Sequence, residues 1–355
     1  MTQHGPDYYL SAKIPSVRNN GTEMLNGENI MGYYLPLGAT NIMTTGEEYK
    51  NIFPVWDWTR VPGTTAVSTA ASAELRWYFF GSNVFGGGVS NGRDGVAAYV
   101  NAYQGVEARK AYFFIDGSMI CLGGGITAAK TSEIRTSVNQ CLSEGDCTYG
   151  GEDGVKVLDG RIRNGKVEWA YHEGVGYCFP MGGKVNIWNE EQKGSWRNVR
   201  EGGDTTTVKR KVFSIWISHG DEPSGDTYCY EVIPGKDVDY FREGRFRGRF
   251  RVVENSDAAQ AVESDGRIAV VFYKEGEVKF SEGCSLAADG EAIVLVERTD
   301  AGIEVSVADP VYSRKEINLK LSGAFFGKAG DGKVMKFEMP RGDMAGSTVV
   351  RFVGL

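Results

Sequence analysis

Short segments in which apolar and polar residues alternate dominate the sequence, and Gly, Asp, Asn or Pro separates most of them. Because successive side chains of a strand point to opposite faces, this alternation is typical of β-strands with one buried side. The clearest examples are residues 211–218, 228–234, 268–273, 293–298, 303–307 and 316–322. The chain also has 48 glycines among 355 residues, about twice the usual share, which indicates many tight turns between short strands.

Strands that follow one another at this spacing, without helices between them, favour antiparallel sandwiches over alternating strand–helix units. Residues 92–112 are the best candidate for a short helix, although their pattern is ambiguous. The charge-rich segment 236–251 interrupts the strand pattern, and we place a domain boundary within it. We therefore expect an all-β protein with a large antiparallel sandwich at residues 1–245 and a smaller C-terminal sandwich at residues 246–355.

Composition argues against several classes of function. Lys+Arg 39 against Asp+Glu 46 gives a net charge of −7, whereas a general nucleic-acid binder needs a basic surface. No apolar run approaches the roughly 18 residues that span a bilayer, so we expect a soluble globular protein without a membrane partner. The first 21 residues contain neither a basic nor an apolar region, which argues against a signal peptide.

The cysteines and histidines do not form a recognisable metal or redox motif. No two of the six cysteines have the C-x-x-C spacing, and none of the three histidines is paired at metal-ligand spacing. Cys141 and Cys147 flank a turn-like segment, so they can form a disulfide across a loop, but buried thiols fit the sequence equally well. We interpret His4, His172 and His219 as surface or hydrogen-bonded core residues.

Residues 88–92 match the G-x-S-x-G pattern of serine hydrolases. That motif requires a strand–turn–helix in a parallel sheet, together with an acid and a His, and the all-β context does not supply the sheet. We interpret the segment as a glycine-rich turn, and a hydrolase that uses Ser90 remains our third hypothesis.

Residues 241–253 carry a second ambiguous pattern. As one strand, they would place four arginines on a common face, Arg245, Arg247, Arg249 and Arg251. Four guanidiniums in a row can grip sulfates or carboxylates through bidentate hydrogen bonds. The interpretation that we prefer is a solvated edge strand whose charges discourage pairing with another chain.

Residues 20–92 carry a set of motifs that a generic sandwich does not require. They are TEMLNGEN at 22–29, GYY at 32–34, GATN at 38–41, EEYKNIFP at 47–54, VWDW at 55–58, VPGTT at 61–65, GSN at 81–83 and FGGGVSNG at 85–92. Later motifs are AYFF at 111–114, CLG at 121–123, GYCFP at 176–180, KGSW at 193–196, IWISHG at 215–220, YCYEVIPG at 228–235, ADP at 308–310 and AGSTV at 345–349. In this order, the set resembles the bacterial polysaccharide lyases of family eight, which include hyaluronate, chondroitin AC and xanthan lyases.

The resemblance covers essentially the whole chain and implies the central and C-terminal sandwich part of such a lyase. Family members place an α/α toroid of roughly this size before the sandwich, and that toroid is absent from this chain. By resemblance, the toroid supplies the Tyr and His that serve as acid and base, an Asn and an Arg. The sandwich contributes Glu23 and Asn26, which would hold those groups in place through charge-assisted hydrogen bonds.

The resemblance also implies roles for other residues. Glu28 and Asn29 belong to the same motif as Glu23, and we assign them first to structure and then to substrate binding. Trp77 falls where a relative carries an aromatic residue beside the substrate groove, so it either stacks on a sugar ring or lies half-buried in the core.

Some relatives bind calcium through acidic residues around Asp57. Thr59 and Ser68 stand where further carboxylates would be expected, so we expect no metal site here, and the resemblance implies no cofactor.

Our leading hypothesis is a portion of a lyase that acts on an acidic, uronate-containing polysaccharide of the hyaluronan or chondroitin type. We expect it to be inactive without the helical domain, which either an in-frame segment or a separate α/α toroid chain would supply. The parent family is extracellular or periplasmic. The alternative is a stand-alone, non-catalytic carbohydrate-binding module, and a toroid encoded next to this chain would distinguish the two hypotheses.

Overall fold

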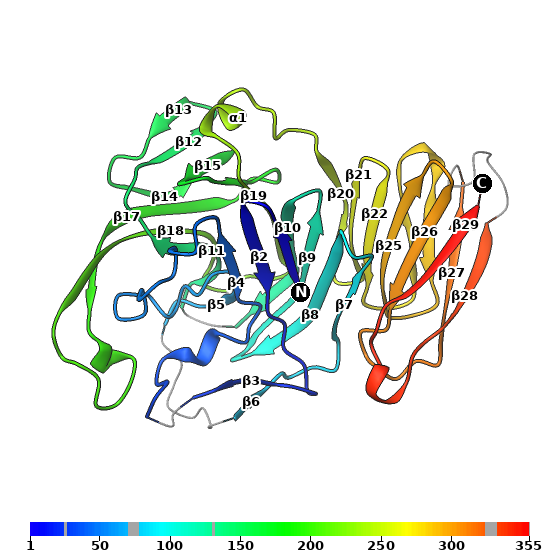
Figure 1. Cartoon of the computed structure of the whole chain (residues 1–355), viewed down its shortest axis with the longest axis horizontal. Coiled ribbons are helices and arrows are strands. Elements are labelled where there is room, and N and C mark those ends of the chain that lie inside the picture. Colours follow the sequence, from blue (N-terminus) through cyan, green and yellow to red (C-terminus); the bar gives the residue numbers. More distant parts are fainter. Residues whose placement is uncertain (25–26, 70–77, 130–131, 324–331, 355) are drawn as a thin grey trace.

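Antiparallel strands make up most of the computed structural model, which describes residues 1–24, 27–69, 78–129, 132–323 and 332–354 (Figure 1). The larger, central sandwich pairs two sheets within these ranges. The nine-stranded sheet has the spatial order β13 (Gly154–Val157), β12 (Cys147–Gly151), β15 (Trp169–His172), β16 (Val175–Cys178), β19 (Asp226–Pro234), β10 (Ser118–Ala128), β9 (Val106–Ile115), β8 (Gly95–Tyr103) and β7 (Gly86–Ser90). The five-stranded sheet has the order β14 (Arg161–Gly165), β17 (Lys184–Gly194), β18 (Val208–Gly220), β11 (Ile134–Leu142) and β5 (Thr65–Val67).

Two small sheets flank the central sandwich, as the described residues define it. One has the order β1 (Thr2–Gly5), β2 (Tyr8–Ala12) and β4 (Thr40–Met43), and the other pairs β3 (Asn20–Glu23) with β6 (Tyr78–Phe80). Among the described residues, helical structure is limited to α1 (Val238–Arg242) and the 3-10 turns η1 (Gly32–Tyr34), η2 (Trp196–Asn198), η3 (Ser281–Gly283) and η5 (Gly342–Met344). None of the described helices has the length and apolar character needed to cross a membrane.

The C-terminal sandwich also pairs two antiparallel sheets in the described part of the chain. Its six-stranded sheet has the order β20 (Phe250–Asn255), β21 (Ala259–Ser264), β22 (Arg267–Phe272), β25 (Ala292–Thr299), β26 (Gly302–Ala308) and β29 (Val349–Gly354). Its four-stranded sheet has the order β23 (Gly276–Lys279), β24 (Ser285–Ala288), β27 (Glu316–Ser322) and β28 (Lys333–Glu338). The prediction of a large sandwich followed by a smaller one, without a helical toroid among the described residues, is confirmed.

Three apolar layers hold the four large sheets together. One layer lies between the five- and nine-stranded sheets, where Phe213 of β18 and Tyr112 of β9 are fully buried. The opposite face of the nine-stranded sheet packs on the six-stranded sheet, so Phe113 of β9 contributes to a second layer with Leu295 of β25. The third layer fills the C-terminal sandwich around Phe337. Because the nine-stranded sheet is covered on both faces, the two sandwiches share a continuous stack of sheets.

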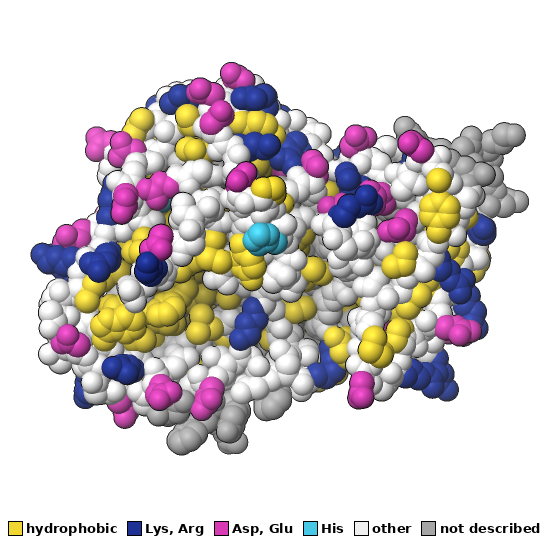
Figure 2. Space-filling view, viewed as in Figure 1, with side chains coloured by type: hydrophobic (Ala, Val, Ile, Leu, Met, Phe, Trp, Pro, Cys, Tyr) yellow, Lys and Arg dark blue, Asp and Glu magenta, His cyan; other side chains and the backbone are white. Residues whose placement is uncertain are grey.

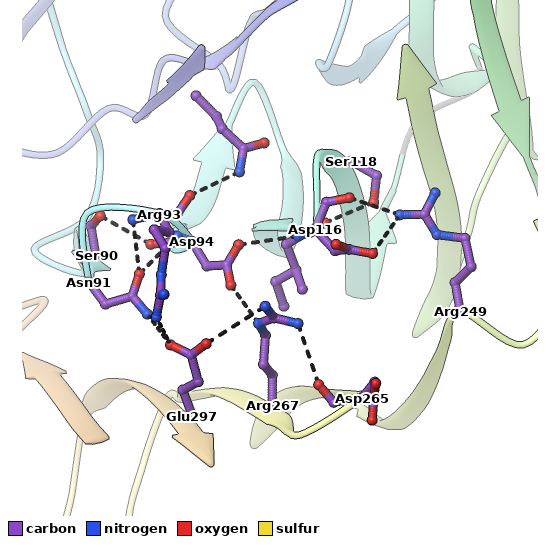
Figure 3. A network of polar contacts seen from close by, with 12 residues as sticks. Ser90, Asn91, Arg93, Asp94, Asp116, Ser118, Arg249, Asp265, Arg267 and Glu297 are labelled. Carbon is purple, nitrogen blue, oxygen red and sulfur yellow. Dashed lines mark hydrogen bonds and ion pairs between the residues drawn. The ribbon is translucent and has the colours of Figure 1, made fainter. Parts of the chain in front are cut away.

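Charged side chains close one edge of the interface between the sandwiches (Figure 3). The Arg267 Nε of β22 lies 2.8 Å from the Asp94 Oδ2 of the β7–β8 turn, and Arg267 also pairs with Glu297 of β25 at 3.7 Å. The Asn91 Nδ2 donates to Glu297 over 3.0 Å, and Arg93 forms a further ion pair with Glu297. Charge pairs therefore join the first sandwich to the second beside the apolar interface.

The prediction of a short helix at residues 92–112 is wrong, because β8 and β9 cover most of that segment. Sheets cover both faces of these strands, so apolar side chains are required on both sides and the alternation typical of a half-buried strand disappears. An alanine-rich apolar run of this kind cannot be separated from a buried helix by its periodicity alone.

The prediction that four arginines share one face of a strand is also wrong. Residues Gly244 and Gly248 adopt positive φ angles of 71° and 73°, so the chain turns after α1 and β20 begins only at Phe250. The arginines have separate partners: Arg245 pairs with Glu243, Arg247 with Glu168, Arg249 with Asp116, and Arg251 with Glu263. They therefore do not form a joint site for anions, and only Arg251 lies in the edge strand β20.

All six cysteines are buried thiols, so Cys141 and Cys147 are not joined in a disulfide. Burial raises the pKa of both thiols, which keeps them protonated and unreactive.

Candidate functional site

Glu23 ends β3 and its side chain is exposed, while Met24 directly after it is fully buried. Strand β3 pairs with β6 in antiparallel register, and Glu23 lies opposite Tyr78. A buried anchor next to an exposed carboxylate fixes the backbone at this point and directs the Glu23 carboxylate outward. The structure therefore presents the first predicted site residue on the surface, at the end of a strand.

Asn29 ties the loop after Glu23 back onto the strand. Its Nδ2 donates to the Glu23 carbonyl over 3.0 Å, and its Oδ1 accepts from the Gly32 N–H over 2.8 Å. The loop then enters η1, where Tyr34 is fully buried. Asn29 thus brings Glu23 and the 27–31 loop together through backbone atoms, which is the structural role that we assigned to it first.

The other predicted site residues are less fully defined. Glu28 is exposed in the same loop. Asn26 and Trp77 lie outside the described residues, so their proposed roles remain predictions.

A second loop supports the 27–31 loop from the side. The connection between β17 and β18 passes through η2, and the Val199 carbonyl accepts from the Ile30 N–H over 3.0 Å. The Glu201 N–H donates to the Gly27 carbonyl over 2.6 Å, and Val199 is only 7% exposed because it packs into the central core. We did not predict from the sequence that this loop belongs to the site; the KGSW motif at residues 193–196 was the available signal.

Aromatic side chains gather in the connection between β4 and β5, residues 44–64. The rings of Phe53 and Trp56 lie 5.6 Å apart, those of Trp56 and Trp58 lie 5.3 Å apart, and Phe53 is 38% exposed. Figure 2 shows hydrophobic side chains around a hollow in the lower left of this face, over the region that holds the blue connection after β4 in Figure 1. This connection touches the end of β17, since a Cβ on Gly194 would lie 1.7 Å from the Pro54 carbonyl oxygen.

The Asp57 carboxylate is engaged by protein groups. It accepts from the Thr59 N–H over 2.9 Å and pairs with Arg60 over 2.6 Å, and Arg60 together with these hydrogen bonds holds the pKa of Asp57 below its usual range. The Arg60 guanidinium lies 4.4 Å from the Trp188 ring centroid and 4.5 Å from that of Trp216. Within the described part of the chain, no group of three or more His, Cys, Asp or Glu side chains is arranged to hold a metal ion.

Two buried histidines have structural partners. The His172 Nε2 lies 2.9 Å from the Ser143 Oγ, and burial lowers the pKa of His172 to about 4, so the imidazole is neutral at pH 7. The His219 Nδ1 lies 2.8 Å from the Asp226 carboxylate. The Ser90 hydroxyl donates to the Asp94 carbonyl over 3.1 Å, so neither histidine serves Ser90 as a base. This geometry does not support a serine hydrolase.

Comparison with known proteins places this geometry in context. The model of the polysaccharide lyase family 8 super-sandwich domain matches residues 1–244, and that of the family's C-terminal beta-sandwich domain matches residues 251–318. Chondroitinase-AC from Pedobacter heparinus is 32% identical over 353 residues, which are 97% of this chain and 49% of that protein. Hyaluronate lyase from Thermasporomyces composti is 29% identical over 323 residues, which are 86% of this chain and 40% of that protein.

Solved structures agree with the sequence matches. The structure of chondroitinase AC lyase in enzyme–oligosaccharide complexes aligns with a TM-score of 0.91 at 30% identity, covering 99% of this chain and 52% of that one. Chondroitin AC lyase from Streptomyces coelicolor A3 in complex with chondroitin sulphate aligns with a TM-score of 0.83 at 25% identity, covering 100% of this chain and 48% of that one. The chain therefore spans about half the length of these chondroitin AC lyases.

Proposed function

Because the chain belongs to polysaccharide lyase family 8, we propose that it forms the sandwich side of a cleft in which an acidic, uronate-containing polysaccharide is cleaved by β-elimination. A helical half, either a further domain or a separate chain, supplies the reacting groups. The substrate is of the hyaluronan or chondroitin type, since relatives bearing those names match almost the whole chain. We also propose the extracellular or periplasmic location of the parent family.

The chemistry explains why a sandwich would contribute supporting groups. Elimination removes the C5 proton of a uronate, which is weakly acidic while the neighbouring carboxylate carries its charge. A base must take that proton, an acid must protonate the leaving glycosidic oxygen, and hydrogen bonds at the carboxylate must stabilise the developing enolate. Each contribution depends on placement to a fraction of an ångström, so a carboxylate on a rigid strand can hold the reacting groups in position.

Glu23 is the residue that we assign to this positioning role, with Asn26 beside it in sequence. The exposed side chain of Glu23 at the fixed end of β3 is the observation that carries the proposal. Asn29 and the connection between β17 and β18 both restrain residues 27–31, so the Glu23 carboxylate stands on a supported surface. The exposed Phe53 and the half-buried Trp56 in residues 44–64 offer a helical half an apolar surface to contact.

A chimera tests the proposal. We would join the helical half of Pedobacter heparinus chondroitinase-AC to this chain and follow the ultraviolet absorbance of the unsaturated product from chondroitin and hyaluronan. We expect product from the chimera and none from the chain alone. A chimera that melts cooperatively but forms no product from either polymer would contradict the proposal.

Substitution of Glu23 then tests the residue assignment within the chimera. Glu23→Gln removes the charge but keeps the shape, and we expect kcat to fall about 100-fold with a small change in KM, as for loss of a group that organises the transition state. Glu222→Gln is the matched control, because it makes the same change at an exposed position between β18 and β19, outside the motif. Equal kcat values for the two variants would remove Glu23 from its proposed role.

A further inference from the structure

Two arginines stand beside the candidate site in the connection between β17 and β18. Within this connection the exposed residues Arg197 and Arg200 flank the buried Val199. The connection is well anchored: the Arg200 and Val199 N–H groups both donate to the Trp196 carbonyl over 3.0 Å, and the Arg197 N–H donates to the Asp204 carbonyl over 3.0 Å. Its backbone is therefore fixed while the two guanidinium-bearing side chains face solvent.

The same connection is joined directly to the loop that follows Glu23. The two backbone hydrogen bonds from Ile30 to Val199 and from Glu201 to Gly27 lie immediately beside Arg200 in sequence. The loop carrying Arg197 and Arg200 thus shares an edge with the loop that starts at Glu23. We refer to residues 195–203 as the arginine loop.

Arg197 and Arg200 differ from most arginines of this chain in their electrostatic surroundings. Arg60, Arg247 and Arg267 each form an ion pair with a carboxylate. No ion pair or side-chain hydrogen bond joins Arg197 or Arg200 to any residue that the structure describes. A guanidinium without a carboxylate partner keeps its planar set of N–H donors for a ligand.

Two carboxylates also occur near these arginines in sequence. Glu201 is exposed and follows Arg200, and its side chain lies against Gly27. The Asp204 carboxylate accepts from the Thr206 N–H and hydroxyl, both over 2.8 Å, which orients it within its own turn. Neither carboxylate forms a salt bridge with the two guanidiniums in the described structure, so the arginine loop presents an unpaired cationic surface beside Glu23.

We propose that Arg197 and Arg200 bind an acidic group of the polysaccharide, a carboxylate or a sulfate, at the edge of the cleft. This inference rests on the proposed function and adds a binding contact that the sandwich itself supplies. Since the whole chain carries a net charge of −7, a polyanion needs a local cationic surface to approach it. The two arginines provide that surface and set where a polymer chain lies relative to Glu23.

Binding of polymers to the full chain tests this inference without requiring catalysis. We would measure affinity for size-defined oligosaccharides of hyaluronan, which offers carboxylates only, and of chondroitin sulfate, which offers both groups. The test variant is Arg197→Gln with Arg200→Gln. The control is Arg341→Gln with Arg351→Gln, which removes two exposed arginines and the same charge from the C-terminal sandwich.

We expect the test variant to bind at least tenfold more weakly and with a smaller salt dependence, while the control changes affinity by less than twofold. A loss for both polymers assigns the contact to a carboxylate, and a loss for chondroitin sulfate alone assigns it to a sulfate. Equal affinities of test and control variants, or no binding of either polymer by the unmodified chain, would overturn the inference. The chimera measures elimination separately, so failure here is distinguishable from failure of the lyase proposal.

Discussion

The two sandwiches differ in how many polar side chains they bury. The described part of the C-terminal sandwich buries few, Gln260, Ser285, Glu297, Ser306 and Asp309, beside a core of aliphatic and aromatic residues, methionines and Cys284. The central sandwich buries many more, including Lys110, Asn139 and Gln140. A buried polar group destabilises a fold unless it is hydrogen-bonded, so the central sandwich must have a structural use for these residues.

These polar side chains hydrogen-bond to the connection of residues 44–64, whose backbone N–H and carbonyl groups are not paired within a sheet. The Gln140 side chain accepts from the Asp57 N–H over 2.8 Å and donates to the Asp57 and Arg60 carbonyls over 3.0 Å. Lys110 donates to the Gly63 carbonyl, and the Tyr112 hydroxyl lies 3.1 Å from the same oxygen. In the C-terminal sandwich, by contrast, two-residue turns join β21 to β22 and β25 to β26. Long irregular segments beside the site are thus held by buried polar side chains, which short turns do not require.

The largest expected effect is that of Gln140→Leu, which removes the partner of three backbone groups of the 44–64 connection. At about 1–3 kcal/mol for each buried group left unsatisfied, we expect the free energy of unfolding to fall by about 4 kcal/mol. Urea unfolding measures the loss, and hydrogen exchange should show it first in residues 44–64. Gln192→Leu, in the half-buried part of β17, is the control and should change stability by about 0.5 kcal/mol or less. Equal free energies of unfolding for the two variants would contradict the stabilising role of the buried polar side chains.

Arg267→Met tests whether the two sandwiches unfold as one unit. Asp94 is only 5% exposed, and burial raises its pKa, so loss of Arg267 leaves a buried carboxylate without its charge partner (Figure 3). We expect a loss of about 3 kcal/mol by urea unfolding, at the lower end of values for broken buried pairs. Adding Asp94→Asn should recover part of that loss. If Arg267→Met leaves the unfolding of both sandwiches unchanged, the charge pairs do not couple them.

Unlike the two preceding variants, Lys110→Met is expected to raise the free energy of unfolding. Lys110 is fully buried, and burial lowers its pKa from 10.5 to about 7. Between these two values the unfolded chain binds a proton that the folded chain lacks, so the stability of the unmodified protein rises with pH across this window. The Gly63 carbonyl keeps Tyr112 as a partner in the variant. We expect Lys110→Met to gain about 2 kcal/mol at pH 7, with an advantage that shrinks towards pH 10.

Thermal unfolding at both pH values measures this gain. Lys274→Met, at an exposed lysine between β22 and β23, is the control and should show no comparable dependence on pH. A loss of stability in Lys110→Met at pH 7 would show that the hydrogen bond to Gly63 outweighs the burial of the ammonium.

The sequence predicted the parts of this molecule in which local pattern and tertiary environment agree. Strands with one buried face, such as β27, alternate visibly along the chain, and the strand prediction for 316–322 coincides with β27. Segment 92–112 was misjudged because sheets bury both faces of β8 and β9, an arrangement that erases alternation. The prediction for the four arginines was wrong for another reason. Two glycines with positive φ interrupt the extended backbone that would have placed the arginines on one face.

In the candidate site, too, some features were visible in the local sequence and others depend on the tertiary structure. The motif around Glu23 was visible in sequence, and the structure adds that its carboxylate is exposed at a strand end. The arginine loop lies about 170 positions further along the chain and meets the site through two backbone hydrogen bonds with Gly27 and Ile30. Backbone pairing of this kind carries no side-chain signature, so spacing along one sequence could not reveal it.

The smallest effect concerns His172, which distinguishes the two cores at acid pH. Burial lowers the pKa of His172 from 6.5 to about 4. Between these two values the unfolded chain binds a proton that the folded chain does not bind, so the free energy of unfolding falls as the pH falls through this window. We expect His172→Gln to remove roughly 1 kcal/mol of the stability change between pH 7.5 and 5.5. His4→Gln, at an exposed histidine, is the control and should leave the change intact. Hydrogen exchange at both pH values should place the effect in the central sandwich. An equal response in the C-terminal strands would mean that both sandwiches sense the same proton through their shared interface.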